Sequence, residues 1–273
     1  MSLVPRRRRE LVRRTTRERV PFRWRVALRR APHLARWVWK RPPMLPRGPE
    51  LPVVVASRTS PLRRPGTAYE GALQAAKEHN VRRAAAEVHA RQIGPGQAFS
   101  WHDHVGPPLR RRGFVDGPEL HDGRLAVGPG GGLCQVANLV FWLAVHGGMH
   151  IVERHRHDLD LFPDSGRTVP FGLGATVFWP HRNLVVRNPH TVPLRLSLEV
   201  RDGALWGRLE APEDLGATWG VREEGHRFTR TGDTVWRENR LFRWRRGEDG
   251  SIEEQLLAEH RARVAYPVAA EEM

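Results

Sequence analysis

The chain of 273 residues contains one cysteine and no apolar run long enough to cross a bilayer. A single cysteine excludes an intramolecular disulfide framework and a cysteine-rich zinc site. Its longest apolar runs fall short of the roughly eighteen residues that predict a transmembrane helix. The basic N-terminus, including the four arginines at residues 6–9, is not followed by the apolar segment of a secretory signal. We therefore expect a cytoplasmic protein.

Positive charge is concentrated at the N-terminus. Residues 1–50 contain fifteen Arg and one Lys against three Glu, and so carry +13 of the net charge of +15. Trp24, Trp37 and Trp39 lie among these arginines, a combination that favours binding to an anionic membrane, so we expect residues 1–47 to hold the protein at the inner membrane face. The alternative is an unfolded tail that binds polyanions weakly. Specific nucleic-acid binding is not expected, because the rest of the chain is nearly neutral.

Composition divides the chain into three parts. After the basic arm, residues 1–50, comes a segment rich in Pro, Gly and Arg at residues 51–70, which predicts a linker. Residues 51–56 within it also fit a short edge strand. The predicted domain covers residues 71–273, and its first core helix is expected over residues 70–92, where apolar side chains recur at helical intervals.

The second half of the domain changes to strand-like patterns. Residues 175–179 and 184–186 are rich in β-branched and aromatic side chains, and residues 194–200 alternate apolar with polar or small ones. Asp202 and Gly203 then give a strong hairpin signal. We predict an α+β fold, with helices around a glycine-rich cysteine loop and an antiparallel, β-rich C-terminal half. Further paired strands are predicted over residues 228–245 and 252–264.

The only cysteine, Cys134, follows three glycines, residues 130–132, and precedes an apolar segment of helical period. Glycines permit positive φ and close approach of a ligand. A thiol in the first turn of a helix is at the positive end of the helix dipole, which favours the thiolate, and free N–H groups there can hold an oxyanion. We therefore predict a reactive thiol with a lowered pKa. The alternative is a cysteine that serves as a small apolar side chain.

Helical spacing predicts which residues after Cys134 face the core. The expected buried positions are Val136, Leu139, Val140, Leu143 and Ala144. The other face then carries Cys134, Asn138 and Trp142, so Cys134 is expected at the edge of a site. His155 and His157 follow about twenty residues later and can supply the base that thiol catalysis needs.

Other chemistries are less well supported. His102, Asp103 and His104 are donors that suit zinc, but the spacing of known zinc motifs such as H-E-x-x-H is missing from the chain. Residues 128–132 are not followed by the Lys and Ser/Thr of a phosphate-binding loop. We therefore expect no metal ion and no cofactor.

Several segments together resemble the VanW family, named from glycopeptide (vancomycin) resistance gene clusters. Residues 80–101 are similar to its pattern N…LAA…PGE.FSF, and residues 129–138 to its signature PGGG.CQ..N. Residues 152–157 match ERH.H. The C-terminal segments at 238–243 and 258–266 resemble the tail of short, single-domain members, so the resemblance covers about residues 75–266.

The resemblance implies a cell-envelope role and a possible cysteine acyltransferase. Members with an extracellular VanW domain are linked to peptidoglycan and look like cysteine L,D-transpeptidases. By this comparison Cys134 is the nucleophile, His157 the preferred base and His155 the second choice. A peptidoglycan peptide or precursor is the implied partner. The residues expected to contact it are Gly131, Gly132, Gln135, Asn138 and Trp101.

One departure from the family pattern bears on catalysis. Where members usually show G.DAT, this chain has Gly174 in place of the Asp. If that Asp orients the histidine, another group must do so here. The alternative function is therefore a non-catalytic accessory protein that binds a cell-wall precursor at the inner membrane face.

Overall fold

A computed structural model of the chain describes residues 31–35, 37–39, 44–63, 71–121, 124–156, 159–160 and 169–268. The chain divides into two compact units, Met1–Arg41 and Pro42–Met273. The described part of the first unit is helical; residues 1–30 of the predicted arm lie outside the described residues. Among the described residues, no helix is both long and apolar enough to cross a bilayer.

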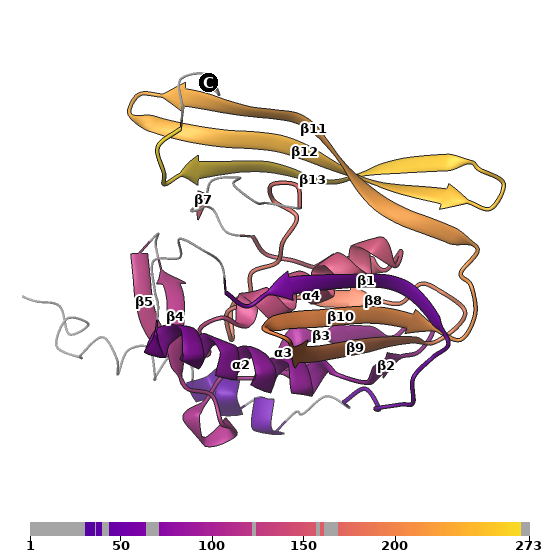
Figure 1. Cartoon of the computed structure of the whole chain (residues 1–273), viewed down its shortest axis with the longest axis horizontal. Helices are drawn as coiled ribbons and strands as arrows, with labels where there is room; N and C mark the ends of the chain where they lie inside the picture. Colours follow the sequence, from indigo (N-terminus) through magenta and orange to yellow (C-terminus); the bar gives the residue numbers. More distant parts are fainter. Residues whose placement is uncertain are drawn as a thin grey trace, which may run out of the picture. The chain divides into compact units, whose positions relative to one another are not determined.

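The second unit contains a four-stranded antiparallel sheet in the order β1-β10-β9-β2 (Figure 1). Its central strands β9 (Leu194–Arg201) and β10 (Ala204–Ala211) are joined by the predicted hairpin, and both Asp202 and Gly203 adopt positive φ. The edges are β1 (Val53–Pro61) and β2 (Arg91–Ile93). Residues 53–61 therefore form an edge strand, which was the alternative to a linker for this segment.

The globular unit also begins earlier than predicted. Leu45 is buried in the main core, and its backbone N–H donates to Nε2 of His104 at 3.1 Å. Arg91 Nη1 donates to the carbonyl of Leu45 at 2.6 Å. Residues from about 44 onwards are thus part of the domain rather than of the basic arm.

Helix α4 (Leu133–His146) packs across β10 and β1 of this sheet. All five apolar residues predicted on its buried face are at most 2% exposed. Gly207 on β10 makes this packing possible, because a Cβ there would lie 2.7 Å from Leu139 and 3.1 Å from Leu143. Helix α2 (Ala72–Val88) contacts both α4 and β9, and is shorter at both ends than predicted. Contacts with α2, β1 and β10 thus fix the position of α4.

Smaller elements surround this core. A three-stranded sheet has the order β3-β8-β6, and β4 pairs with β5 as a hairpin. Their bounds, with the short helices nearby, are β3 (Ala98–Ser100), α3 (Trp101–His104), η2 (Arg110–Arg112), β4 (Asp116–His121), β5 (Arg124–Pro129), β6 (His150–Glu153) and β8 (Val185–Arg187).

The C-terminal part forms a second sheet, in the order β11-β12-β13-β7, in which β11, β12 and β13 are long (Figure 1). These are β11 (Ala217–Thr231), β12 (Thr234–Gly247) and β13 (Ile252–Val264), and β7 (Leu159–Asp160) pairs in parallel with the end of β13. A buried ion pair joins Arg237 Nη1 to Asp160 Oδ2 at 3.0 Å, and the Tyr266 hydroxyl donates to the same oxygen. The described domain is thus strand-rich and of mixed α+β class, and its strands are mostly antiparallel.

Residues 175–179, predicted as a strand, are not one. Their backbone groups bond to side chains and loops instead of to a neighbouring strand. The Ala175 N–H donates to Asn138 Oδ1 at 2.6 Å, and the Thr176 N–H to the carbonyl of His155 at 2.8 Å. The β-rich composition reflects burial of this segment rather than strand pairing.

His260 on β13 is a buried neutral histidine. Its Nδ1 lies 2.9 Å from Nη1 of Arg156, and its ring packs against Gly172, where a Cβ would be 2.2 Å away. Burial lowers the pKa of His260 to about 3, and the charges of Arg154 and Arg156 add to this effect. Protonation of this ring is therefore opposed by its surroundings in the folded state.

This depressed pKa predicts a pH-dependent stability. Between about pH 6.5 and pH 3, His260 carries a proton in the unfolded chain but not in the folded one, so the free energy of unfolding falls as the pH falls, by up to about 1.4 kcal/mol per pH unit. We expect His260→Gln to reduce the slope of unfolding free energy against pH between 6 and 4, measured by urea denaturation. His150→Gln, at an exposed position on β6, is the control. An unchanged slope in His260→Gln would contradict a buried neutral ring.

Candidate functional site

The glycines before α4 pack tightly against other backbone. A Cβ on Gly131 would lie 2.3 Å from the backbone carbon of Gly117 on β4, and one on Gly132 would lie 2.6 Å from Cγ of Lys77 on α2. Gly130 and Gly132 have φ of 91° and 97°, values that favour glycine. The run is therefore required for close packing and for the turn into α4. Contact of Gly131 and Gly132 with a substrate stays a prediction.

Cys134 is in the first turn of α4, as predicted for the helix N-terminus. Its side chain is half-buried, and the thiol donates to the carbonyl of Val177 at 3.6 Å. The N–H groups of Leu133 and Gln135, on either side of it, donate to the carbonyls of Gly130 and Gly132.

The predicted lowering of the thiol pKa is wrong for this conformation. Burial raises the pKa of Cys134 above its ordinary value, and the negative charge of Glu119 adds to the effect. The hydrogen bond to Val177 also requires a proton on the sulfur. Desolvation therefore outweighs the helix dipole, because low dielectric surroundings penalise the thiolate directly.

Residues 172–177, named here the cover segment, lie over the start of α4. Asn138 binds its Ala175 N–H and Cys134 its Val177 carbonyl. Arg154 donates through Nε to the carbonyl of Gly174 at 2.7 Å and through Nη2 to that of Gly172. The cover segment is thus attached to α4 and to the segment after β6 through main-chain groups.

His155 is the candidate base that the structure describes. Its Nε2 lies 2.9 Å from Oε1 of Glu153, which also accepts from the N–H of Asn183 at 3.3 Å. The carbonyl of His155 binds the cover segment at Thr176. His157, the preferred base, lies outside the described residues. Glu153 was not singled out from the sequence, although it is the Glu of the ERH.H match.

Cys134, Asn138 and Trp142 form a row along the accessible side of α4, as the helical spacing predicts. Asn138 is exposed, and the other two are half-buried. Beside the row, Gln135 Nε2 donates to Ser60 Oγ at 2.9 Å, but the buried Gln135 Oε1 has no partner among the described residues.

Two further positions differ in accessibility. A Cβ on Gly174, where the family pattern has Asp, would lie 2.9 Å from Asn138 Oδ1, so a side chain at this position would press on Asn138. Trp101 is 2% exposed and belongs to the main core. A ligand would reach Trp101 only after its neighbours moved.

The described residues contain no group of three or more His, Cys, Asp or Glu side chains arranged to hold a metal ion. His102 and His104 instead lie within the fold, and burial lowers the pKa of both imidazoles. Their ring nitrogens bond to backbone groups of Arg182 and Ser100 respectively.

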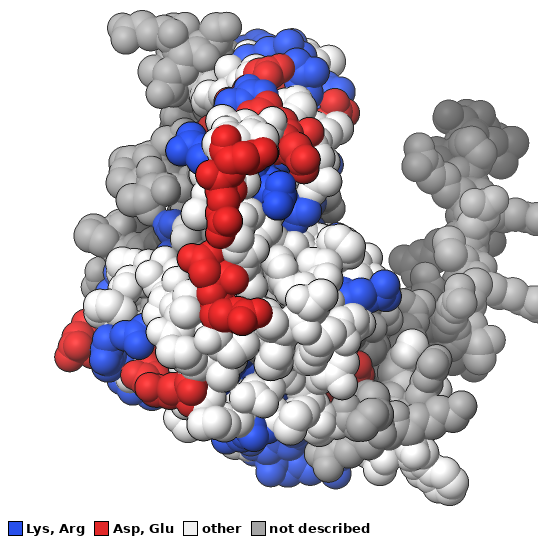
Figure 2. Space-filling view, turned by 90° about the vertical axis from the view of Figure 1, so that its right-hand side faces the viewer, with Lys and Arg blue, Asp and Glu red and all other residues white. Residues whose placement is uncertain are grey.

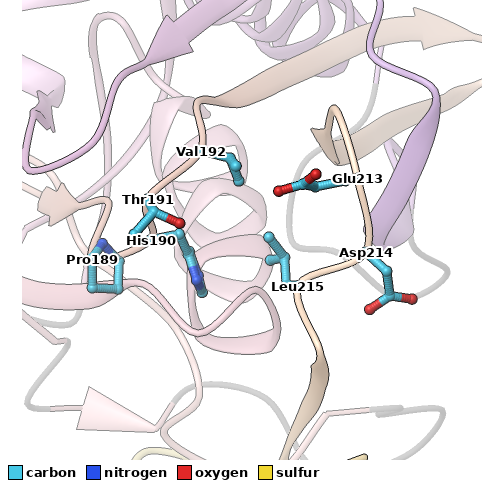
Figure 3. Close-up of a pocket in the computed structure, with 7 residues that line it drawn as sticks. All are labelled: Pro189, His190, Thr191, Val192, Glu213, Asp214 and Leu215. Carbon is cyan, nitrogen blue, oxygen red and sulfur yellow. The ribbon is translucent and has the colours of Figure 1, made fainter.

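A surface pocket lies away from Cys134, between residues 189–192 and 213–215 (Figure 3). The Glu213 carboxylate points toward Val192, while Asp214 points away. On one face of the molecule acidic side chains form an almost continuous line with basic groups beside it (Figure 2). This face carries mixed charge, in keeping with the near-neutral composition after residue 50.

The close packing of the glycine run predicts a large effect of Gly131→Ala. The added methyl group would meet the Gly117 backbone, which cannot move like a flexible side chain, so we expect a loss of at least about 2 kcal/mol in unfolding free energy. The control is Gly94→Ala, whose Cβ would meet only the end of the Gln97 side chain. Urea denaturation measures both. Equal stabilities would contradict the close approach of these backbones.

The raised pKa predicts slow alkylation of the folded protein. Because Cys134 is the only cysteine, the rate of iodoacetamide labelling against pH reports this thiol alone. We expect the inflection of the folded protein to lie above that of the urea-unfolded chain, whose thiol titrates near about 8.5. An inflection below the unfolded value would restore the activated thiol that the sequence predicted.

Comparison with known proteins gives the family. The domain described as "VanW like protein" matches residues 76–209. The chain is 24% identical over 220 residues to "Vancomycin B-type resistance protein VanW" of Enterococcus faecalis, covering 80% of each chain. It is 27% identical over 140 residues to "Uncharacterized protein YoaR" of Bacillus subtilis, covering 50% of this chain and 44% of that protein. No solved structure is significantly similar. The chain belongs to the VanW family, whose Enterococcus faecalis member is named for vancomycin resistance.

Proposed function

We propose that the domain is a thiol-dependent acyltransferase of the L,D-transpeptidase type that acts on a peptidoglycan peptide or its precursor. The observation that carries this proposal is the position of the chain's only cysteine, in the first turn of α4 and at one end of an accessible row of side chains. In this reading the helix start forms the glycine-rich cysteine loop of the active site.

The reaction proceeds in two steps. The Cys134 thiolate attacks a peptide carbonyl carbon, the C–N bond breaks, and the amine leaves with a proton from the histidine, which gives a thioester. An acceptor amine then attacks the thioester carbon and gives a proton to the histidine, the C–S bond breaks, and the histidine returns that proton to the sulfur. The Cys134 N–H stabilises the oxyanion in both steps.

His157 is proposed as the base, with His155 as the reserve. The absence of a carboxylate at Gly174 leaves the orienting role to another acid, and Glu153 already contacts His155. This contact fixes the orientation of the His155 ring, which is the role of the third member of a triad. Glu153 is therefore proposed to support this part of the site.

Catalysis requires the cover segment to move. The Val177 carbonyl must release the thiol before the thiolate can form. Two buried polar groups without partners among the described residues flank this contact in sequence, Gln135 Oε1 and Thr176 Oγ1. An unpaired buried polar group costs about 1–3 kcal/mol, so both would gain from a bound peptide's polar groups.

A second function is favoured by the raised pKa. A protonated, half-buried thiol suits a non-catalytic accessory protein that binds a cell-wall precursor along the same row. In that case Cys134 contributes contact area and no covalent intermediate forms.

Intact-protein mass spectrometry with stem-peptide donors separates the two functions. Acyl transfer predicts a thioester on Cys134 that hydroxylamine removes and that Cys134→Ala cannot form. We expect His157→Ala to abolish the adduct and His155→Ala to leave a measurable remainder, because a positioned base contributes about 10²–10⁴ in rate. Donor binding without any adduct in the wild-type protein would establish the accessory function instead.

A further inference from the structure

The first unit exposes apolar side chains on its helical residues. Residues 31–35 and 37–39 are helical. Val38 is 52% exposed and Trp39 is 88% exposed, the highest value among the exposed large apolar side chains of the described residues. Ala31 and Ala35 are exposed as well. Apolar side chains that lie together and stay open to solvent mark a surface that binds a partner or a membrane.

The helical period gathers these side chains on one side. At about 100° per residue, five apolar residues fall within an arc of about 140°. They are Leu34, Val38, Ala31, Ala35 and Trp39. All except Leu34, which is half-buried, are exposed. The helical residues therefore present a continuous apolar side to solvent.

The basic residues of the same stretch fall on the other side. When the same period is applied to residues 29–41 of the sequence, no charged residue falls within the apolar arc. The opposite side carries Arg29, Arg36 and Lys40, which lie outside the described residues. A basic side opposite an apolar side that ends in a tryptophan is typical of helices that lie in the plane of a membrane surface.

Charge identifies the kind of membrane. Residues 1–41, the whole first unit, contain fourteen Arg and one Lys against two Glu, a net charge of +13. Each basic residue near an anionic surface strengthens binding by about fivefold. Positive charge alone attracts any polyanion, including nucleic acid. The exposed apolar side favours a lipid surface, because only a membrane offers an apolar interior beneath its charged groups.

We propose that residues 29–41 bind an anionic membrane surface as an interfacial helix. Val38 and Trp39 enter the boundary between headgroups and acyl chains, while Arg36 and Lys40 stay among the anionic headgroups. The helix thereby holds the domain that begins near residue 44 at the membrane. This inference does not depend on any chemistry at Cys134. The alternative is an arm that binds polyanions through charge alone.

Flotation of the full chain with vesicles tests the apolar contact. The vesicles contain phosphatidylglycerol and phosphatidylcholine in equal amounts, or phosphatidylcholine alone. We expect the wild type to bind the mixed vesicles far more tightly, and Trp39→Ser to weaken that binding by roughly tenfold or more, as loss of a buried large apolar side chain does. The control is Ile252→Ser, which removes a side chain that is 57% exposed on β13 and should leave the binding unchanged.

An exchange of two residues tests the helical arrangement at constant composition. Val38→Lys with Lys40→Val moves the charge to the middle of the apolar side and keeps the net charge and the amino-acid content of the arm. We expect this variant to bind the mixed vesicles at least tenfold more weakly than the wild type. Binding through charge alone predicts no change. An unaltered urea unfolding midpoint shows that the domain stays folded in each variant.

The basic side is tested by neutralising two charges. Arg36→Gln with Lys40→Gln should weaken binding to the mixed vesicles by about twenty-five-fold. The matched control is Arg187→Gln with Arg208→Gln, which removes two exposed arginines from β8 and β10 and should have little effect.

Three results would overturn the proposal. The first is equal binding of the exchanged variant and the wild type to the mixed vesicles. The second is equal binding of the wild type to both kinds of vesicle. The third is binding to a single-stranded RNA with no binding to the mixed vesicles, which would assign the arm to nucleic acid instead.

Discussion

Burial of one face of α4 against the main sheet determines where Cys134 lies. Leu139 and Leu143 pack over Gly207, and the whole apolar face of the helix is in the core. Once that face is fixed, the 3.6-residue period of the helix leaves Cys134, Asn138 and Trp142 on the accessible side. The catalytic proposal depends on this orientation, because a rotation of the helix by one residue would bury the row.

The same packing explains why the thiol is not activated in the described conformation. The start of α4 is enclosed by β4, α2 and the cover segment. This enclosure destabilises the thiolate by more than the helix dipole stabilises it. A thiol that stays protonated until a ligand displaces its cover is less exposed to oxidation. In this account activation accompanies substrate binding and is not a property of the free protein.

Periodic features could be predicted from the sequence, and long-range contacts could not. The buried face of α4 and the Asp202–Gly203 hairpin depend on spacing and on turn residues, which are local. Residues 175–179 were mistaken for a strand because their partners, Asn138 and His155, are distant in sequence. The contact of Arg58 with Trp142 could likewise not be predicted from the sequence, because it requires β1 to pair with β10. The direction of the Cys134 pKa shift depends on how deeply the thiol is buried, and the residues around the glycine run do not indicate this.

Hydrogen exchange of the cover segment tests the central claim most directly. In Cys134→Ala protein, which cannot react, the Ala175 N–H is held by Asn138, and this bond breaks if a peptide displaces the segment. The account predicts that a saturating stem peptide speeds exchange at Ala175 and leaves the buried amides of α4 unchanged. Binding of the peptide with unaltered or slower exchange at Ala175 would contradict it, because the ligand would then occupy a site that leaves the thiol covered.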